Sequence, residues 1–390
     1  MRTPPHPPSA DPGIAYGASC RGDWPLDPAV TYVNHGGYGV VPNEVLRAQA
    51  AWRERMERNP MRFLTYELPE LQREAAASLA LYLGARGEDM VFVDNATTGC
   101  NAVLRSLSFA PGDEILITSL AYGAVKQAVR YVAERSGAAI VEAEIPLPLA
   151  DMSAITDAVA ARLGPRTRLA IFDHIASHSA VLLPVAALTR LAHVAGARVL
   201  IDGAHAAGQV SLDLPAIGAD WYVGNCHKWL MAPRGCGFLW AGPEAQALVH
   251  PLAISHGYGG GFIAEFDWTG TRDPTPYLSV PAGIAFHQRL GATALMARNT
   301  ALAGEAARLL AGAWNTQVLA PAEAFAAMAV VGLPLAEAPT REHALAIQRR
   351  LSDEYRIEAA IMAQGGALWV RIAAQAYNEL DDYERLASAL

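Results

Sequence analysis

The sequence predicts an α/β protein in which a mainly parallel seven-stranded sheet lies between helices and a smaller C-terminal α+β domain follows. Seven short runs of β-branched and aromatic residues recur between residues 91 and 240, and helical segments separate most of them. Buried apolar runs that alternate with helices are typical of a parallel sheet covered on both faces. After about residue 280, long helices rich in Ala, Leu and Arg replace this alternation. A chain of 390 residues that is 52% hydrophobic is also large enough for two or three packed domains.

The segments before the sheet are an arm and two helices. Residues 1–28 hold five prolines in their first twelve positions, which predicts an extended N-terminal arm. A helical pattern over residues 41–58 opens on Pro42 and Asn43, a helix start signal. A second helix is expected over residues 71–83, before a glycine.

The sheet region alternates between strands and helices. The last two strands are too close in sequence for a helical crossover, so we expect a hairpin-like return between them. The expected strands are residues 91–93, 115–118, 139–141, 169–172, 199–201, 221–223 and 238–240. The helices expected among them include residues 101–108, 124–136 and 184–196.

The C-terminal region has a different pattern, which predicts a separate α+β unit. We therefore divide the chain into an arm (1–28), a large domain (29–280) and a small domain (281–390). The expected helices of the small domain are residues 282–290, 293–314 and 340–354, and its strands are residues 326–331, 357–360 and 368–372.

Composition excludes several classes of partner. The net charge of −8 argues against nucleic acid and against an anionic membrane surface. The apolar stretches are too short to span a bilayer, and the polar, Pro-rich start does not resemble a signal peptide. The four cysteines form no CxxC pair. We expect a reduced cytoplasmic protein with a small-molecule substrate.

Three of the expected strands end in polar residues, where ligands bind in an open α/β sheet. Residues 94–99 (DNATTG) open a helix, whose N-terminus suits a phosphate, although Thr-Thr-Gly there is also an ordinary N-cap. Residues 202–205 (DGAH) put the Asp202 carboxylate at the end of a buried strand, where it either caps a turn or pairs with a cation. Residues 224–229 (GNCHKW) place Lys228 in apolar surroundings, which lower the pKa of a lysine and make it a nucleophile.

Lysine occurs at two positions only, Lys126 and Lys228, and arginine supplies the other basic residues. We expect Lys126 to be a surface cation on the polar side of a helix, which leaves Lys228 as the candidate amine nucleophile. A helix N-terminus for a phosphate, a carboxylate for a ring nitrogen and a lysine for an imine together predict a site for a phosphorylated aldehyde cofactor.

These residues resemble the cofactor core of fold-type I pyridoxal-phosphate enzymes of the class V aminotransferase family. Residues 32–39 (YVNHGGYG), 224–233 (GNCHKWLMAP), 266–281 (FDWTGTRDPTPYLSVP) and 370–378 (VRIAAQAYN) are similar to its isopenicillin N epimerase-like subgroup. The similarity runs from about residue 30 to the end of the chain. It implies the cofactor pyridoxal 5'-phosphate (PLP), an amino-acid substrate and a homodimer.

The resemblance implies roles for the cofactor-binding residues. Lys228 would form the internal aldimine, Asp202 would keep the pyridine nitrogen protonated, and His205 would bind the ring hydroxyl. Tyr122 would stack on the ring and is a candidate acid for the face opposite Lys228. The residues that would hold the phosphate are Thr97, Thr98, Asn225 and His227.

The resemblance also implies roles at the substrate side of the site. Arg371 would clamp the substrate carboxylate in a bidentate pairing. Asn34 would line the substrate entrance. Thr271 would be donated across a dimer interface, so that the site would be complete only in the dimer.

The resemblance points first to epimerisation at an amino-acid α-carbon in secondary metabolism. The alternatives are C–S β-elimination or decarboxylation-dependent oxidative deamination of a cysteine S-conjugate, then an aminotransferase or a non-catalytic binding protein. Residues 356–366 lack the cysteine of a persulfide-forming desulfurase. Two departures from the subgroup, the glycine-rich loop 256–262 and the sequence SHS at 177–179, lie where the substrate side chain is expected.

Two other chemistries are not supported by the sequence. His174 and His178 are four residues apart but lack a third ligand, so no metal site is expected. Ser177 and Ser179 lie near His178 and Asp173 in sequence, but no GxSxG elbow surrounds either serine.

Overall fold

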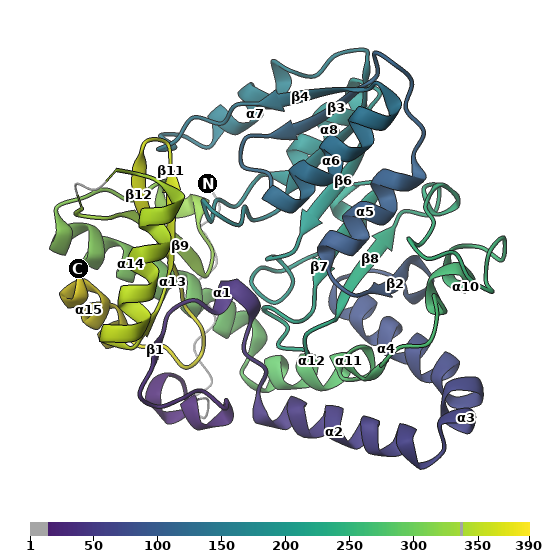
Figure 1. Ribbon diagram of the computed structural model, residues 1–390, viewed down its shortest axis with the longest axis horizontal. Helices are drawn as coiled ribbons and strands as arrows, with labels where there is room; N and C mark the ends of the chain where they lie inside the picture. The colour runs from purple at the N-terminus through teal and green to yellow at the C-terminus, as the bar shows by residue number, and fades with distance from the viewer. Residues whose placement is uncertain (1–14, 336–337) are drawn as a thin grey trace, which may run out of the picture.

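The frame of the protein is a seven-stranded sheet (Figure 1). The computed structural model describes residues 15–335 and 338–390. The strands are β2 (Met90–Val93), β3 (Glu114–Thr118), β4 (Ala139–Ala143), β5 (Thr167–Asp173), β6 (Arg198–Gly203), β7 (Trp221–Asn225) and β8 (Gly237–Ala241). Their order is β2-β8-β7-β6-β5-β3-β4, and only the pairs that include β8 are antiparallel. All seven predicted strands and the predicted hairpin-like return are confirmed.

Residues along the strands alternate between the two faces of the sheet, as a period of two requires. Phe92 and Tyr222 face one hydrophobic core with helix α4 (Leu68–Tyr82) and helix α8 (Val185–Val194). Val91 and Val223 face the other core with helix α5 (Ala96–Ser106) and helix α6 (Gly123–Ser136). Because both faces are covered, nearly every central strand residue is apolar and buried, which is why the strands read as continuous apolar runs.

The smaller sheet lies at the other end of the molecule (Figure 1). Its strands β11 (Ala360–Gln364), β12 (Ala367–Ala373) and β9 (Met328–Gly332) are antiparallel in that order. The helices beside it are α13 (Ala292–Trp314), α14 (Arg341–Tyr355) and α15 (Leu380–Ala389). This region is the predicted α+β unit, although the strand expected at residues 357–360 is divided between β10 (Ile357–Glu358) and β11.

The predicted domain boundaries at residues 28/29 and 280/281 remain a prediction, and two contacts cross them. Strand β1 (Thr31–Tyr32) pairs in parallel with β10 of the C-terminal region. Helix α12 (Val280–Arg289) packs on α4 and on α2 (Asn43–Arg58) beside the large sheet.

The described part of the N-terminus, residues 15–28, does not form the predicted extended arm. Residues 15–28 contain two 3₁₀ turns, Gly17–Ser19 and Arg21–Asp23. The physical reason is Trp24, whose ring lies 5.2 Å from Phe286 and 5.0 Å from Tyr377 in a T-shaped arrangement. Burying this ring ties the segment to the fold. The rest of the predicted arm, residues 1–14, lies outside the described residues.

Several helices differ from the prediction or were not predicted. Helix α5 begins at Ala96, five residues before the predicted start, because the Asn95 side chain accepts a hydrogen bond from the Thr98 N–H and caps the helix. The elements that were not predicted are α1 (His35–Tyr38), α3 (Pro60–Arg62), the π-helical turn Phe63–Glu67, α7 (Ser153–Ala160), α9 (Leu214–Ile217), α10 (Phe262–Asp267), α11 (Thr275–Leu278) and α15, and the 3₁₀ turns Gly87–Asp89, Gln246–Leu248 and Ala322–Ala324.

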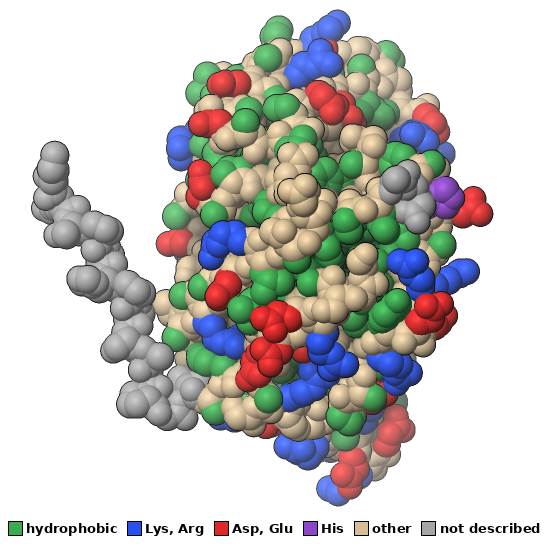
Figure 2. Space-filling view, turned by 90° about the vertical axis from the view of Figure 1, so that its left-hand side faces the viewer, with side chains coloured by type: hydrophobic (Ala, Val, Ile, Leu, Met, Phe, Trp, Pro, Cys, Tyr) green, Lys and Arg blue, Asp and Glu red, His purple; other side chains and the backbone are tan. Residues whose placement is uncertain are grey.

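The surface is of mixed charge on the face that Figure 2 shows, where acidic and basic side chains are interspersed. Among the described residues, no helix combines the length and apolar character needed to cross a membrane.

Helix α8 offers a test of the packing on the large sheet. Replacing Leu188, which is fully buried between α8 and the sheet, with alanine should destabilise the protein by about 2–5 kcal/mol. Val194 on the same helix is 90% exposed, so Val194→Ala should change stability by no more than about 0.5 kcal/mol. Urea titration followed by circular dichroism measures both, and equal midpoints for the two variants would contradict the assigned packing.

Candidate active site

The carboxyl edge of the large sheet opens into a pocket of about 240 Å³. Residues from β5, β6, β7 and the starts of α5 and α6 line it, together with α1 from the N-terminal segment. The predicted site residues among its lining are Thr97, Tyr122, Asp202, His205, Asn225, His227 and Lys228. The fold therefore brings together, in one cavity, residues that the sequence spreads over the ends of four strands, β2, β3, β6 and β7.

The start of helix α5 forms one end of the pocket. Asn225 Oδ1 accepts a hydrogen bond from the Ala96 N–H at 2.9 Å and so joins the end of β7 to the helix N-terminus. Thr97 lines the pocket. Thr98 does not, since its backbone N–H and hydroxyl both turn to the Asn95 side chain, at 2.9 and 3.3 Å. The dipole of an eleven-residue helix, with the Thr97 N–H that neither asparagine side chain binds, suits a phosphate at this end.

His227 lies at the same end and is neutral. Burial lowers its pKa to about 4. Its Nδ1 lies 2.9 Å from the carbonyl oxygen of Cys236, which can only accept, so Nδ1 carries the proton. A phosphate dianion beside the other ring nitrogen would favour the protonated imidazole, in which both nitrogens donate.

The candidate nucleophile, Lys228, loses its proton more readily than an ordinary lysine. Burial, helped by the positive charge of Arg371 and opposed by Asp202, lowers its pKa to about 8. Its Nζ lies 3.1 Å from His205 Nε2. Burial also holds the pKa of His205 far below its ordinary value, so this imidazole is neutral. The Trp229 indole N–H donates to His205 Nδ1 at 3.5 Å, which leaves Nε2–H to donate to the amine of Lys228.

Asp202 is buried at the end of β6, directly beside a second carboxylate. The register of β5 and β6 pairs it with Asp173, and both residues line the pocket. Burial raises the pKa of Asp202, and burial together with the charge of Asp202 raises that of Asp173 well above its ordinary value. A protonated ring nitrogen at this point would supply the positive charge that Asp202 needs in order to stay ionised.

Arg371 is a buried guanidinium whose donors are only partly used. One terminal nitrogen donates to the carbonyl and hydroxyl of Ser177, and the other donates to Asn34 Oδ1 at 3.0 Å. Its Nε is buried and has no hydrogen-bond partner among the described residues. Burial lowers the pKa of Arg371 to about 10, so it remains a cation at neutral pH. A cation with a spare donor beside the pocket suits a carboxylate.

Three predicted residues lie in different places from the cluster around Lys228. Asn34 contacts Arg371 and is not among the residues that line the pocket. Tyr122 lies at the start of α6 at the pocket and is 38% exposed. Thr271 is exposed outside the pocket of its own chain, next to Arg272, which forms an ion pair with Asp94 at 2.8 Å. The dimer role of Thr271 therefore stays a prediction.

The pocket also holds Asp173 and Tyr38, for which the sequence predicts no part in this site. Ser177 lines it too, in agreement with the expectation that residues 177–179 lie near the substrate side chain. Asp173 ends strand β5 at the same edge as Asp202, so the strand-end rule that selected Asp202 could have selected it too. His174, considered as a zinc ligand, instead makes a hydrogen bond to the Tyr222 hydroxyl at 2.8 Å.

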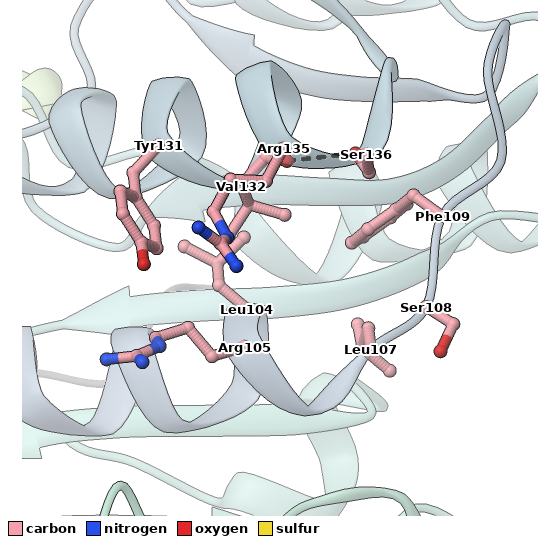
Figure 3. Close-up of a pocket in the computed structure, with 9 residues that line it drawn as sticks. All are labelled: Leu104, Arg105, Leu107, Ser108, Phe109, Tyr131, Val132, Arg135 and Ser136. Atoms are coloured by element: carbon pink, nitrogen blue, oxygen red, sulfur yellow. Dashed lines mark hydrogen bonds between the residues drawn. The ribbon is translucent and has the colours of Figure 1, made fainter.

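A second hollow, of about 440 Å³, lies between α5 and α6 (Figure 3). Its lining includes Arg105 and Arg135, whose guanidinium groups lie 5.7 and 5.4 Å from the centre of the Tyr131 ring. The predicted site residues do not line it. The candidate chemistry is therefore in the pocket at the sheet edge.

A buried amine, a buried carboxylate and a helix N-terminus at one carboxyl edge define a fold-type I site for a phosphorylated aldehyde cofactor. Residues 37–351 match the family described as aminotransferase class-V, and the chain belongs to this family. Its cofactor is pyridoxal 5'-phosphate. The chain is thus a PLP-dependent enzyme, and its relatives include epimerases and lyases.

Two curated relatives and one solved structure illustrate this similarity. The isopenicillin N epimerase of Streptomyces clavuligerus is 33% identical, over 97% of this chain and 98% of that protein. An L-cysteine desulfhydrase of Arabidopsis thaliana is 32% identical, over 93% of this chain and 87% of that protein. The structure of the cystine C–S lyase C-DES with its product cysteine persulfide has a TM-score of 0.78 at 24% identity and covers 92% of this chain and 96% of that one, which shows the shared fold.

The two lysines make the candidate nucleophile easy to test. Lys228→Ala should yield protein without the covalent cofactor band that borohydride removes, because no other amine lines the pocket within the described residues. Lys126→Ala is the matched control, since Lys126 bonds to Glu142 and to the Ser119 carbonyl oxygen. Mass spectrometry after borohydride reduction should find the cofactor on Lys228 in wild type and in Lys126→Ala. A cofactor bound covalently to Lys228→Ala would contradict the assignment.

The lowered pKa of Lys228 predicts how cofactor capture depends on pH. Only the neutral amine attacks an aldehyde, and for a base with a lowered pKa the neutral form predominates above that pKa. The rate of covalent capture by cofactor-free protein should therefore rise with pH and be half-maximal near pH 8 rather than near 10.5. Stopped-flow absorbance over a pH series measures the midpoint, and a midpoint near 10.5 would show that Lys228 is solvated.

Proposed function

We propose that this enzyme is a C–S β-lyase that acts on cysteine or a compact cysteine S-conjugate. The observation that carries the proposal is the content of the pocket, which holds one amine base, Lys228, and whose lining residue Ser177 bonds to the guanidinium of Arg371. Elimination needs one base at the α-carbon, whereas epimerisation needs a base on one face and an acid on the other. The pocket of about 240 Å³ must hold the cofactor as well as the substrate, which favours a small substrate.

In the proposed elimination each residue of the site has a separate role. When bound, the cofactor supplies an electron sink for the negative charge that develops at the substrate α-carbon. Arg371 binds the substrate carboxylate, with Ser177 and Asn34 holding its fork in place. Lys228 removes the α-proton, and the neutral His205 beside it keeps the amine in its basic form. Asp202 keeps the cofactor ring nitrogen protonated.

The overall reaction balances without an oxidant. The C–S bond breaks with its electron pair leaving on sulfur, which takes up a proton and departs as a thiol or as hydrogen sulfide. Water then releases the nitrogen, so that one substrate and one water yield pyruvate, ammonia and the thiol. Relatives named L-cysteine desulfhydrase support this choice.

A persulfide route is less well supported. The four cysteines, Cys20, Cys100, Cys226 and Cys236, are all buried. They are not among the residues that line the pocket. A desulfurase needs a thiol that reaches the substrate sulfur, so the described residues favour direct elimination. The buried free thiols also fit the reducing cytoplasm that we propose as the location.

Epimerisation at the α-carbon is the second candidate. Two phenols line the pocket from elements other than the Lys228 loop: Tyr122 from the start of α6 and Tyr38 from α1. Either could serve as the acid opposite Lys228. The isopenicillin N epimerase relative, matched over 98% of its length, supports epimerisation as well as the L-cysteine desulfhydrase relatives support elimination.

We also propose that the enzyme is a homodimer. Thr271 is exposed in its own chain and follows a glycine in the GTRD segment. In a dimer it could reach the phosphate end of the partner's pocket. Analytical ultracentrifugation of the purified enzyme tests the assembly directly.

One experiment separates the candidate reactions. The holoenzyme is incubated in deuterium oxide with L-cysteine, and with S-methyl-L-cysteine as a compact conjugate. The lyase should release pyruvate and the thiol in equal amounts, and Lys228→Ala should release neither. Recovered amino acid that carries α-deuterium and has lost its optical purity, without pyruvate, would favour the epimerase. Carbon dioxide with an aldehyde would indicate decarboxylative deamination and exclude the lyase.

A further inference from the structure

His35 lies directly behind the Lys228 loop and is fully buried. It belongs to α1 in the N-terminal segment, and its ring lies 5.0 Å from that of Trp229, the residue after Lys228. It is not among the residues that line the pocket. The site assignments above give it no role, although both of its ring nitrogens have hydrogen-bond partners.

The partners of His35 determine which ring nitrogen carries the proton. Burial lowers its pKa to about 4, so the imidazole is neutral and has one N–H. Nε2 lies 3.1 Å from the carbonyl oxygen of Lys228, which can only accept. The proton is therefore on Nε2. Nδ1 then accepts from the Tyr377 hydroxyl at 2.9 Å, so Tyr377 satisfies the ring nitrogen that carries no proton.

The carbonyl of Lys228 is held at a second point as well. The Met231 N–H donates to it at 3.3 Å, and Met231 has a φ of 57°, in the left-handed region that a residue with a side chain rarely adopts. The Ala232 N–H donates to the Cys226 carbonyl and closes the same turn. The backbone of Lys228 is thus fixed by a strained turn on one side and by His35 on the other.

The segment that carries His35 is itself tied to the substrate side of the site. Asn34, the preceding residue, accepts a hydrogen bond from Arg371. Val33 donates to the Glu358 carbonyl oxygen and accepts from the Ala373 N–H. Gly39 packs so closely on the Lys228 loop that a Cβ there would lie 2.1 Å from the His227 carbonyl oxygen. Adjacent residues of one segment therefore contact Arg371 and the backbone of Lys228.

We propose that His35 is a positioning residue that directs the Lys228 amine into the pocket by holding the Lys228 carbonyl, with Tyr377 supporting the His35 ring through its other nitrogen. The inference rests on the proposed role of Lys228 as the cofactor lysine. His35 acts through the backbone and touches neither cofactor nor substrate. If the carbonyl is released, the lysine can turn toward water, which favours its charged form.

The test is a pH titration of the visible absorption band of the holoenzyme. His35→Phe keeps a ring of similar size but cannot donate, so the titration midpoint should rise by about half a unit to one unit, the equivalent of one buried hydrogen bond. Cofactor release into a large excess of apo-acceptor protein should become several-fold faster. His35→Gln, whose Nε2 can still donate, should restore most of the wild-type midpoint, and Tyr377→Phe should shift it less than His35→Phe.

Tyr383→Phe is the matched control for the loss of a buried hydroxyl. The Tyr383 hydroxyl donates to the Ala373 carbonyl oxygen and is as deeply buried as that of Tyr377, but it does not contact His35 or Lys228. The Tyr383→Phe variant should have a lower unfolding temperature but the same midpoint in the pH titration of the visible band. If His35→Phe and Tyr377→Phe also lower only the unfolding temperature, the inference is wrong and His35 is structural. If His35→Phe fails to fold, the titration midpoint of Tyr377→Phe alone tests the inference. Wild-type protein without a visible band would instead refute the cofactor role of Lys228, and the inference with it.

Discussion

An amine kept out of water at the carboxyl edge of the large sheet is the constraint on which the rest of the site depends. Lys228 has a lowered pKa because the β7–β8 return folds back under α1 and buries it. Burial and the cation of Arg371 both lower the pKa of the lysine, and the negative charge of Asp202 opposes them without cancelling them. A lysine exposed to water would keep its ordinary pKa and would offer far less neutral amine to an aldehyde at neutral pH. The burial that is costly for folding is therefore what makes the residue useful.

The same site needs negative charge next to that amine, and the sheet supplies it in a pair. Asp173 and Asp202 lie side by side because β5 and β6 are parallel and in register, and two carboxylates so placed cannot both ionise without a cation. A protonated ring nitrogen is such a cation. In the proposed reaction the substrate carboxylate is bound separately by Arg371, which comes from the small sheet and bonds to Asn34 and to the pocket residue Ser177. Cofactor and substrate recognition thus come from different layers of the fold.

The elements that could be predicted were those with strong local patterns. The seven strands of the large sheet are short apolar runs between polar turns, and α13 and α14 are long and end close to where their patterns end. The cofactor-binding residues could be predicted because ligands bind at the carboxyl ends of strands in an α/β sheet, and the residues at those ends form contiguous motifs such as 224–229. Helix α1 could not, because its sequence HGGY has no helical preference and it forms where His35 and Asn34 find partners far away in sequence. The turns at residues 17–23 could not either, since they depend on Trp24 packing against Phe286 and Tyr377.

By itself, then, the sequence determined the fold class, the family and the candidate nucleophile, because periodicity, motif order and the presence of only two lysines are local or countable properties. Only the tertiary structure decided which donors remain free and which are used. It placed Asn34 on Arg371 and brought Asp173 beside Asp202. It also set His35 behind the Lys228 carbonyl. The reason is that hydrogen-bond partners and desolvation are fixed by contacts between segments tens to hundreds of residues apart, and no local pattern encodes those contacts.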